Sequence, residues 1–154
     1  MENSVEKAQD ALENLIKLHY DRIQGYEHAL EDTKDADLKA LFSHNADQSR
    51  QFRAELSAEM DKYGGEVPKD NKFLGDIHKA WMDFKAAITN KDRESVLSSC
   101  EFGEQTILGA YDDVLKYDED DVQIPTSLRT LLQNQHTVIK SAYSQISLLH
   151  AQAD

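Results

Sequence analysis

The sequence has almost no cysteine and very little proline. Cys100 is the only cysteine among 154 residues, which excludes an intramolecular disulfide, and a reducing cytoplasm is the expected location. We interpret Cys100 as a small apolar core residue, because no second cysteine or nucleophile pattern accompanies it. The two prolines, Pro68 and Pro125, both fall between periodic segments and mark breaks in the chain.

Long apolar runs are also missing. No stretch approaches the roughly 18 apolar residues of a membrane span, and the first residues show no basic and apolar leader. The net charge is −12, and such a charge repels phosphate backbones and anionic lipid surfaces. We therefore expect neither nucleic acid nor a membrane as a partner, and solubility is the simplest role for the charge.

Acidic residues are absent from residues 122–153, although the chain contains 29 of them. The same stretch predicts one long amphipathic helix. A di-iron four-helix bundle takes a Glu from each of its helices, two of them within Glu-x-x-His motifs. This stretch has no carboxylate to offer, and no Glu-x-x-His occurs anywhere in the chain. The sequence therefore predicts a bundle while arguing against a di-iron centre.

Four long segments show the apolar spacing of three and four residues that is typical of bundle helices. They cover about residues 4–32, the stretch between Asp35 and Gly64, and about residues 93–116 and 125–150. No segment alternates with period two, so we predict no strands.

Capping residues and breakers set the expected helix ends. Asp35 and Asp92 are predicted to cap the helices that follow them, because a carboxylate can accept from the free N–H groups of a first turn. Gly64 is predicted to end the second helix in the left-handed conformation, and Pro125 suits the first turn of the last one. We predict that the acidic run at residues 118–121 forms a turn.

A shorter helix is predicted at about residues 72–89, between the second and third long helices. Its apolar face includes Trp81, which we expect in the core, while His78 beside that face is expected to be solvated or to cap a carboxylate. A helix of this length can return the chain along the bundle. The predicted fold is therefore all-α, a single ferritin-like four-helix bundle domain over residues 1–154 with this short crossover helix. A plain up-down array of five helices is the alternative.

Several short motifs resemble, in order, a bacterial family of ferritin-like helix-bundle proteins of about 150 residues and of unknown function. The motifs are residues 21–27 (DRIQGYE), 52–56 (FRAEL), 64–65 (GG), 78–85 (HKAWMDFK) and 100–104 (CEFGE), followed by Tyr111. The resemblance covers nearly the whole chain. It implies a ferritin-like fold and no settled activity.

Under the crossover topology, several possible metal ligands fall at neighbouring levels of the bundle interior. Carboxylates and imidazoles together suit a single divalent ion such as Fe, Mn or Zn. The candidate metal ligands are Glu27, Glu101, Glu104, His19 and His136. No cofactor is expected beyond this possible ion.

A structural role is the competing interpretation for the same residues. Glu104 lies on the apolar side of its helix between Cys100 and Leu108, so its carboxylate is predicted to point inward. A buried carboxylate needs a partner, and His19, His136, Arg22 or a Tyr hydroxyl could supply one. His19 and His136 would then be core histidines hydrogen-bonded across helices.

The polar face of the last helix carries only Arg129 and Lys140 as formal charges. Interface cores are depleted of charged residues, so we predict that this helix forms a homo-oligomer interface; a Ser/Thr-rich surface is the alternative.

Three functions fit these observations. The first is a non-enzymatic cytoplasmic bundle that acts as an interaction or stress-associated protein. The second is a metal-binding or metal-storage protein that uses the bundle interior. The third, an oxidase-type enzyme, is disfavoured by the missing carboxylate of the last helix.

Overall fold

The computed structural model describes residues 4–68, 92–121 and 124–153. Four helices make up this part of the chain: α1 (Ser4–Asp32), α2 (Ala36–Lys62), α4 (Arg93–Asp121) and α5 (Thr126–Gln152). No strand occurs in the described ranges, as predicted. The predicted crossover helix at residues 72–89, with His78 and Trp81, lies outside the described residues.

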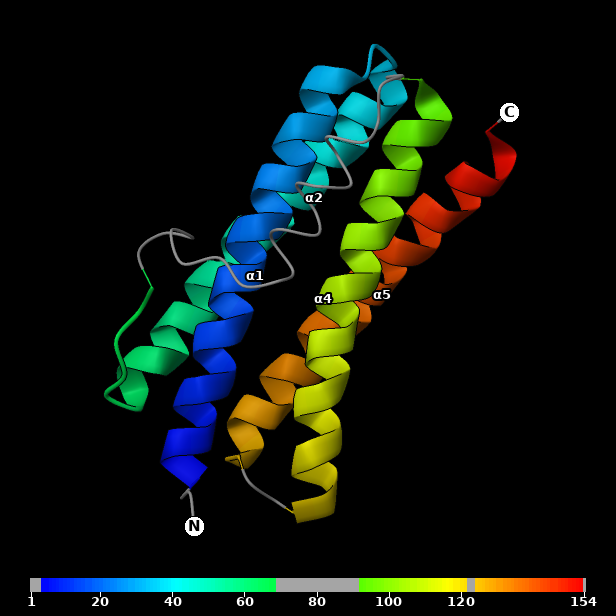
Figure 1. Ribbon diagram of the computed structural model, residues 1–154. Helices are drawn as coiled ribbons and strands as arrows, with labels where there is room; N and C mark the ends of the chain where they lie inside the picture. The colour runs from blue at the N-terminus through cyan, green and yellow to red at the C-terminus, as the bar shows by residue number, and fades with distance from the viewer. Residues whose placement is uncertain (1–3, 69–91, 122–123, 154) are drawn as a thin grey trace.

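The helices run up, down, down and up along the bundle (Figure 1). Contacts between side chains fix these directions. Gln9 of α1 reaches the end of α2 at the backbone oxygen of Tyr63, so α1 and α2 are antiparallel. Arg93 at the start of α4 reaches Asp35 and Asp37 at the start of α2, so α2 and α4 are parallel. This order agrees with the predicted crossover topology and differs from a plain up-down array.

The helix ends follow most of the predicted signals. Gly64 has φ of +72°, a conformation that costs glycine little and other residues more. The Ser95 backbone N–H donates to the carboxylate of Asp92 at 2.8 Å, so Asp92 caps α4. Pro125 occupies the N-cap position of α5, and that helix extends to Gln152, two residues beyond its predicted end.

Two local predictions were wrong. Asp35 occupies the N-cap position of α2, but its side chain makes no capping hydrogen bond, because the Arg93 guanidinium on α4 binds its carboxylate at 2.9 Å. The acidic run at residues 118–121 belongs to α4, which ends at Asp121. No glycine or proline interrupts residues 110–124, so nothing in the sequence stops the helix before Pro125.

The interior contains two apolar cores, one at each end of the bundle. The lower core, at the end of Figure 1 where the N-terminus lies, includes Leu12, Leu15, Leu56 and Leu128. The upper core includes Phe42, Leu97, Cys100 and Ile146, which agrees with the expectation that Cys100 is a core residue. Each core buries its side chains away from water and thereby stabilises the bundle. Between the two cores lies a layer of buried polar side chains.

Candidate functional site

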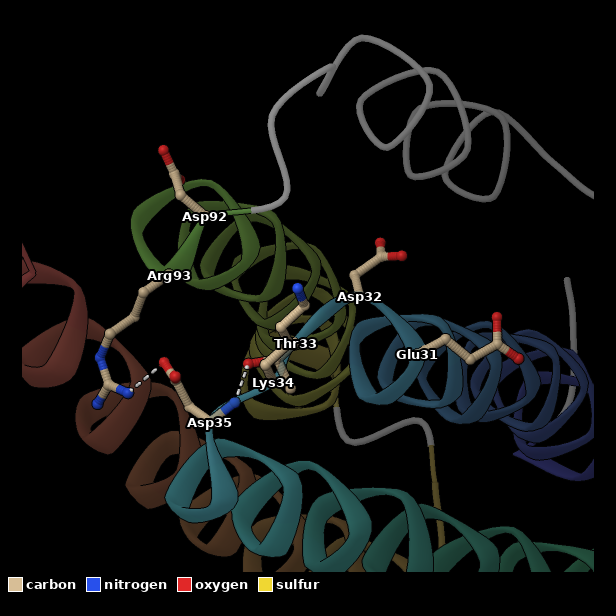
Figure 2. A pocket seen from close by; sticks show the side chains of 7 residues that line it. All are labelled: Glu31, Asp32, Thr33, Lys34, Asp35, Asp92 and Arg93. Carbon is tan, nitrogen blue, oxygen red and sulfur yellow. Dashed lines mark hydrogen bonds and ion pairs between the residues drawn. The ribbon is translucent and has the colours of Figure 1, made fainter.

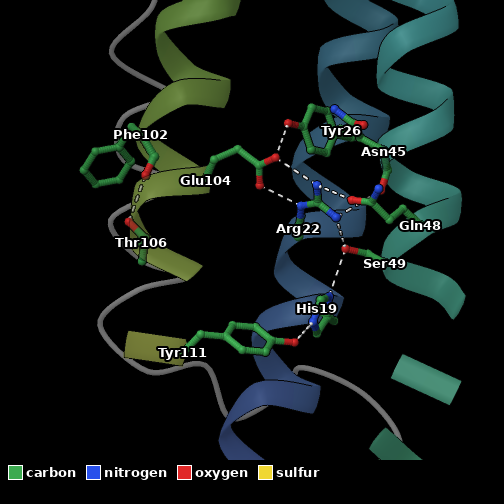
Figure 3. Close-up of polar contacts among 10 residues, drawn as sticks. All are labelled: His19, Arg22, Tyr26, Asn45, Gln48, Ser49, Phe102, Glu104, Thr106 and Tyr111. Atoms are coloured by element: carbon green, nitrogen blue, oxygen red, sulfur yellow. Dashed lines mark hydrogen bonds and ion pairs between the residues drawn. The ribbon is translucent and has the colours of Figure 1, made fainter. Parts of the chain in front are cut away.

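An ion pair between Arg22 of α1 and Glu104 of α4 occupies the middle of this polar layer (Figure 3). The Arg22 side chain is 1% exposed and that of Glu104 is fully buried. Nε and Nη2 of Arg22 donate to the two carboxylate oxygens at 2.6 and 2.8 Å. The Tyr26 hydroxyl donates to the same carboxylate at 2.9 Å. Glu104 thus points inward, as predicted, and Arg22 is one of the partners predicted for it.

Every N–H group of Arg22 has an acceptor. Nη2 also donates to Oε1 of Gln48 at 2.9 Å, while Nη1 donates to the Ser49 hydroxyl at 2.8 Å and to the backbone oxygen of Asn45 at 3.3 Å. A guanidinium has five N–H donors in a fixed plane, and these contacts satisfy all five. Arg22 therefore joins α1 to both α2 and α4. Its buried guanidinium has protein acceptors in place of the water molecules that would solvate it.

The hydrogen bonds continue from Ser49 toward the lower core. Ser49 Oγ lies 3.0 Å from Nδ1 of His19, and Nε2 of His19 lies 2.8 Å from the Tyr111 hydroxyl. Tyr111 donates to Oε1 of Gln135 at 2.7 Å, and the Gln135 amide donates to Glu55 at 3.0 Å. Contacts on all four helices are therefore linked in one network, which we call the polar layer: Arg22, Glu104, Tyr26, Ser49, His19, Tyr111, Gln135 and Glu55.

The directions of these hydrogen bonds show which ring nitrogen of His19 carries its proton. Because Tyr111 donates to Gln135, its oxygen accepts from His19 Nε2–H, and Nδ1 of His19 then accepts from Ser49. His19 is therefore neutral, with the proton on Nε2. Burial, together with the nearby positive charges of Arg22 and Arg53, holds the pKa of His19 well below its usual value.

The neighbouring groups are also fixed in one protonation state. Burial raises the pKa of Tyr26 and of Cys100, and the charge of Glu104 raises both further. Burial likewise raises the pKa of the Tyr111 hydroxyl. For Arg22 burial acts in the lowering direction, but the carboxylate of Glu104 outweighs it and the pKa is raised. The centre of the polar layer thus holds one cation, Arg22, and one anion, Glu104, with neutral donors around them, and these central groups are buried.

The structure does not bring the five predicted metal ligands together. Glu27 is exposed and pairs with Arg50, Glu101 accepts from His150 at 2.9 Å, and His136 lies 2.7 Å from Asp112. Only Glu104 and His19 belong to the polar layer, and Arg22 and Ser49 separate them. His136 makes a cross-helix hydrogen bond, but it is not the core histidine of its structural interpretation, because its side chain is 20% exposed and that of its partner Asp112 is 65% exposed. Metal binding by these residues stays a prediction.

The donor set of the polar layer does not fit a bound metal ion. Glu104 is the fully buried carboxylate of the layer. Both of its oxygens accept hydrogen bonds, from Arg22 and Tyr26, and the guanidinium places a positive charge beside the carboxylate. Across the described ranges, no group of three or more His, Cys, Asp or Glu side chains is arranged to hold a metal ion.

Sequence reasoning placed most polar members of the layer but not their connections. His19, Ser49, Glu104 and Gln135 all interrupt rows of apolar residues, which is the signal that marks them. A Tyr hydroxyl was among the partners predicted for Glu104, but the sequence did not identify Tyr26 as its source, and the role of Tyr111 was missed. Their rings pack in the upper and lower cores respectively, and only the hydroxyl groups reach the layer.

A groove of about 400 Å³ opens between α2 and α5. Five residues of α2 and one of α5 line it: His44, Asp47, Gln48, Gln51, Phe52 and Val138. Gln48 connects this groove to the polar layer, because its side chain accepts from Arg22. Gln48 therefore lies both at the groove and beside the buried guanidinium.

A second pocket, of about 630 Å³, lies at the upper end of the bundle (Figure 2). Four carboxylates line it, those of Glu31, Asp32, Asp35 and Asp92. Arg93 also lines the pocket and binds both Asp35 and Asp37. These ion pairs fasten the start of α4 to the start of α2.

The family of the chain follows from a comparison with protein-family models. Residues 7–117 match the model described as Domain of unknown function (DUF2383). The chain belongs to this family. A search of curated proteins gives no match for the DUF2383 chain.

The fold has a counterpart among solved structures. A structure of a Dps1 mutant from Mycobacterium smegmatis superposes with a TM-score of 0.75 over 96% of this chain and 97% of that chain, at 10% sequence identity. This likeness confirms the all-α, ferritin-like four-helix bundle. At such low identity it shows the fold alone. No helix within the described part of the DUF2383 chain is long and apolar enough to cross a membrane.

Proposed function

We propose that this protein is a non-enzymatic, self-associating bundle that acts through its surface as an interaction protein of the cytoplasm. The observation that carries the proposal is the buried Arg22–Glu104 pair. It fills the position where a metal-binding bundle would need several carboxylates facing one another. The chain supplies its own cation there, so the interior serves structure.

Electrostatics make an added ion unfavourable in the polar layer. A divalent cation beside Glu104 would lie near the guanidinium of Arg22, and repulsion between charges is strong where water is excluded. The member of the polar layer that α5 contributes is the neutral amide of Gln135, which bonds Tyr111 and not Glu104. Binding a metal would therefore require Arg22 to leave its five acceptors.

The surface of α5 is the favoured place for self-association. This helix carries Arg129 and Lys140 and no acid, so its net charge is +2. Because the total is −12, the rest of the chain has a net charge of −14. Two copies of so acidic a chain repel each other over most of their surfaces. They can approach through α5 without placing carboxylates against carboxylates.

The outer face of α5 is available for such a contact. Thr130, Thr137 and Ser141 are exposed in the single chain, so nothing in the described part of the chain covers this face. Val138 and Leu148 are 39% and 60% exposed and add apolar surface. A face of small polar and apolar side chains with few charges is typical of interface cores.

Light scattering on the purified protein tests self-association. We expect a dimer or larger assembly at micromolar concentration, and Ser141→Glu should dissociate it, because the change places a buried acid at the contact. Asn14→Glu adds the same charge to an exposed position of α1 and should leave the assembly intact. A chain that stays monomeric up to millimolar concentration would contradict the proposal.

Elemental analysis tests the interior. Protein purified without chelator should contain far less than one Fe, Mn or Zn per chain. One equivalent of metal that is lost in Glu104→Gln would replace this proposal with the metal-binding alternative.

A further inference from the structure

We infer that the half-buried carboxylate of Glu55 controls which ring nitrogen of the buried His19 carries its proton, through a chain of hydrogen bonds that can reverse its direction. This conformational device lies inside the bundle, goes beyond the proposed self-association and does not depend on it. Three observations support it: the common direction of the bonds, the chemistry of the residues along the chain, and the nature of its two ends.

The hydrogen bonds between Arg22 and Glu55 all point the same way. From donor to acceptor, the chain runs through Arg22, Ser49, His19, Tyr111, Gln135 and Glu55. The donor–acceptor distances lie between 2.7 and 3.0 Å, and Figure 3 shows the part from Arg22 to Tyr111. Bonds aligned in this way polarise one another, so the direction of each depends on its neighbours.

The four residues in the middle of the chain can each donate and accept. A serine or tyrosine hydroxyl changes role by rotation, and a glutamine amide by turning over. A neutral imidazole changes role when its proton moves from one ring nitrogen to the other. All four side chains are at most 1% exposed, so an unmatched donor or acceptor among them is costly. The chain is therefore stable in either direction, provided that every bond agrees.

The two ends of the chain cannot change role. The guanidinium of Arg22 can only donate, and the ionised carboxylate of Glu55 can only accept. Between these ends, the observed direction alone matches every donor with an acceptor, and it places the proton of His19 on Nε2. The carboxylate at the edge of the bundle thus sets the proton position on a histidine that it does not contact.

A donor in place of the Glu55 carboxylate would reverse the bonds. Gln135 would then present its oxygen to that donor and its amide N–H to Tyr111, and Tyr111 would donate to Nε2 of His19. The proton of His19 would move to Nδ1, so the histidine would stay neutral and would donate to Ser49. A hydroxyl oxygen has two lone pairs, so Ser49 can accept from both the histidine and the guanidinium.

A proton on Glu55 supplies such a donor in the natural chain. On its own helix, Gln51 donates to Oε2 of Glu55 at 3.4 Å, and Glu59 lies one turn further on. From α5 the neutral Gln135 faces Glu55, and the two cations of that helix lie at least five residues away along it. From α4, Tyr111 is within electrostatic reach, because its pKa is raised by burial and also by the charge of Glu55. Glu55 is thus the titratable end of the chain.

NMR of protein labelled with ¹⁵N in histidine tests the inference, because the chemical shift of a ring nitrogen shows whether it carries a proton. His19→Gln identifies the His19 signals among those of the six histidines. Near neutral pH, the wild type should carry the proton on Nε2. Glu55→Lys should raise the ratio of the Nδ1–H to the Nε2–H form about tenfold or more, since one mismatched buried hydrogen bond costs at least that much in population. Asp61→Lys makes the same change of charge at an exposed position of α2 and should leave the ratio unchanged.

Two further variants keep the test decisive. Glu55→Gln can donate or accept, so both forms of His19 should be detected. Tyr111→Phe removes a hydroxyl from the chain, and in that background Glu55→Lys should no longer change the ratio. An unchanged Nε2–H form in both Glu55→Lys and Glu55→Gln would overturn the inference. A response to Glu55→Lys that persists with Tyr111→Phe, or that Asp61→Lys reproduces, would also overturn it, because the field of the added charge would then be the cause.

Discussion

The interface between α1 and α4 differs sharply from the opening between α2 and α5. The first is closed by a fully buried ion pair, with Arg22 and Glu104 satisfied by partners on three helices. The second is joined by one described hydrogen bond between Gln135 and Glu55 and then opens into a groove. The chain thus places an interior carboxylate where it can be neutralised internally, and leaves its acid-free helix beside the open surface.

The difference shows how the chain itself neutralises the interior carboxylate of this bundle. A buried ion pair is weak evidence for stability, because removing two charges from water is costly. Removing one member of such a pair is costly, however, so the pair favours the alignment of α1 and α4 that keeps both charges partnered. The alignment of the helices therefore depends on α1–α4 more than on α2–α5.

The largest expected effect comes from breaking the buried pair. Arg22→Met should lower the free energy of unfolding by about 3–5 kcal/mol, because Glu104 would be left as a buried charge without a partner. Urea denaturation followed by circular dichroism measures this. Arg50→Met is the control, since it removes an exposed pair with Glu27 and should cost about 0–1 kcal/mol. Equal losses in the two variants would contradict a special role for the interior pair.

Replacing both members of the buried pair should lower the free energy of unfolding less than replacing one of them. Arg22→Met combined with Glu104→Met removes both charges and fills similar volume, so the double variant should be more stable than either single variant. The double-mutant cycle gives the coupling energy between the two residues. If the double variant loses the sum of the two single losses, the pair does not act as a unit.

The pH dependence of stability should report the neutral His19. Its pKa in the folded chain lies well below its usual value of 6.5, so the unfolded chain binds more protons and stability decreases as the pH falls below about 6.5. This single group contributes at most about 1.4 kcal/mol per pH unit. His19→Gln should reduce the slope of unfolding free energy between pH 7.5 and 5.

A change without a titratable group separates this slope from general destabilisation. Ile139→Val, in the fully buried core, should lower stability by about 0.5–1.5 kcal/mol at every pH and keep the wild-type slope. If His19→Gln also keeps that slope, then another group is responsible for the pH dependence.

The smallest effect is expected at the groove. Val138→Ser should change the free energy of unfolding by less than about 0.5 kcal/mol, because solvent already reaches this side chain and the groove contributes little to the fold. The measurement requires dilute protein, so that self-association does not add to stability. A loss comparable to that of Arg22→Met would show that the opening between α2 and α5 is part of the core.

The sequence by itself determined the helices and much of their ends. Apolar residues spaced three and four positions apart predicted four long helices. Asp92, Gly64 and Pro125 marked helix ends that depend on local backbone chemistry alone. The inward position of Glu104 also followed from the sequence, because a residue between Cys100 and Leu108 on a helix must share their face. Even the absence of acid from the last helix was visible before any contact was known.

Tertiary structure decided which partner each polar group has. Asp35 could cap α2 or bind a cation, and Arg93, 58 residues away in the chain, settled the choice. Glu104 had His19, His136, Arg22 and a Tyr hydroxyl as predicted partners. Only the packing of α1 against α4 selected Arg22 and Tyr26. The direction of the hydrogen bonds through His19 depended likewise on Tyr111 and Gln135. Such choices depend on distances between helices, and periodicity along one helix contains no information about those distances.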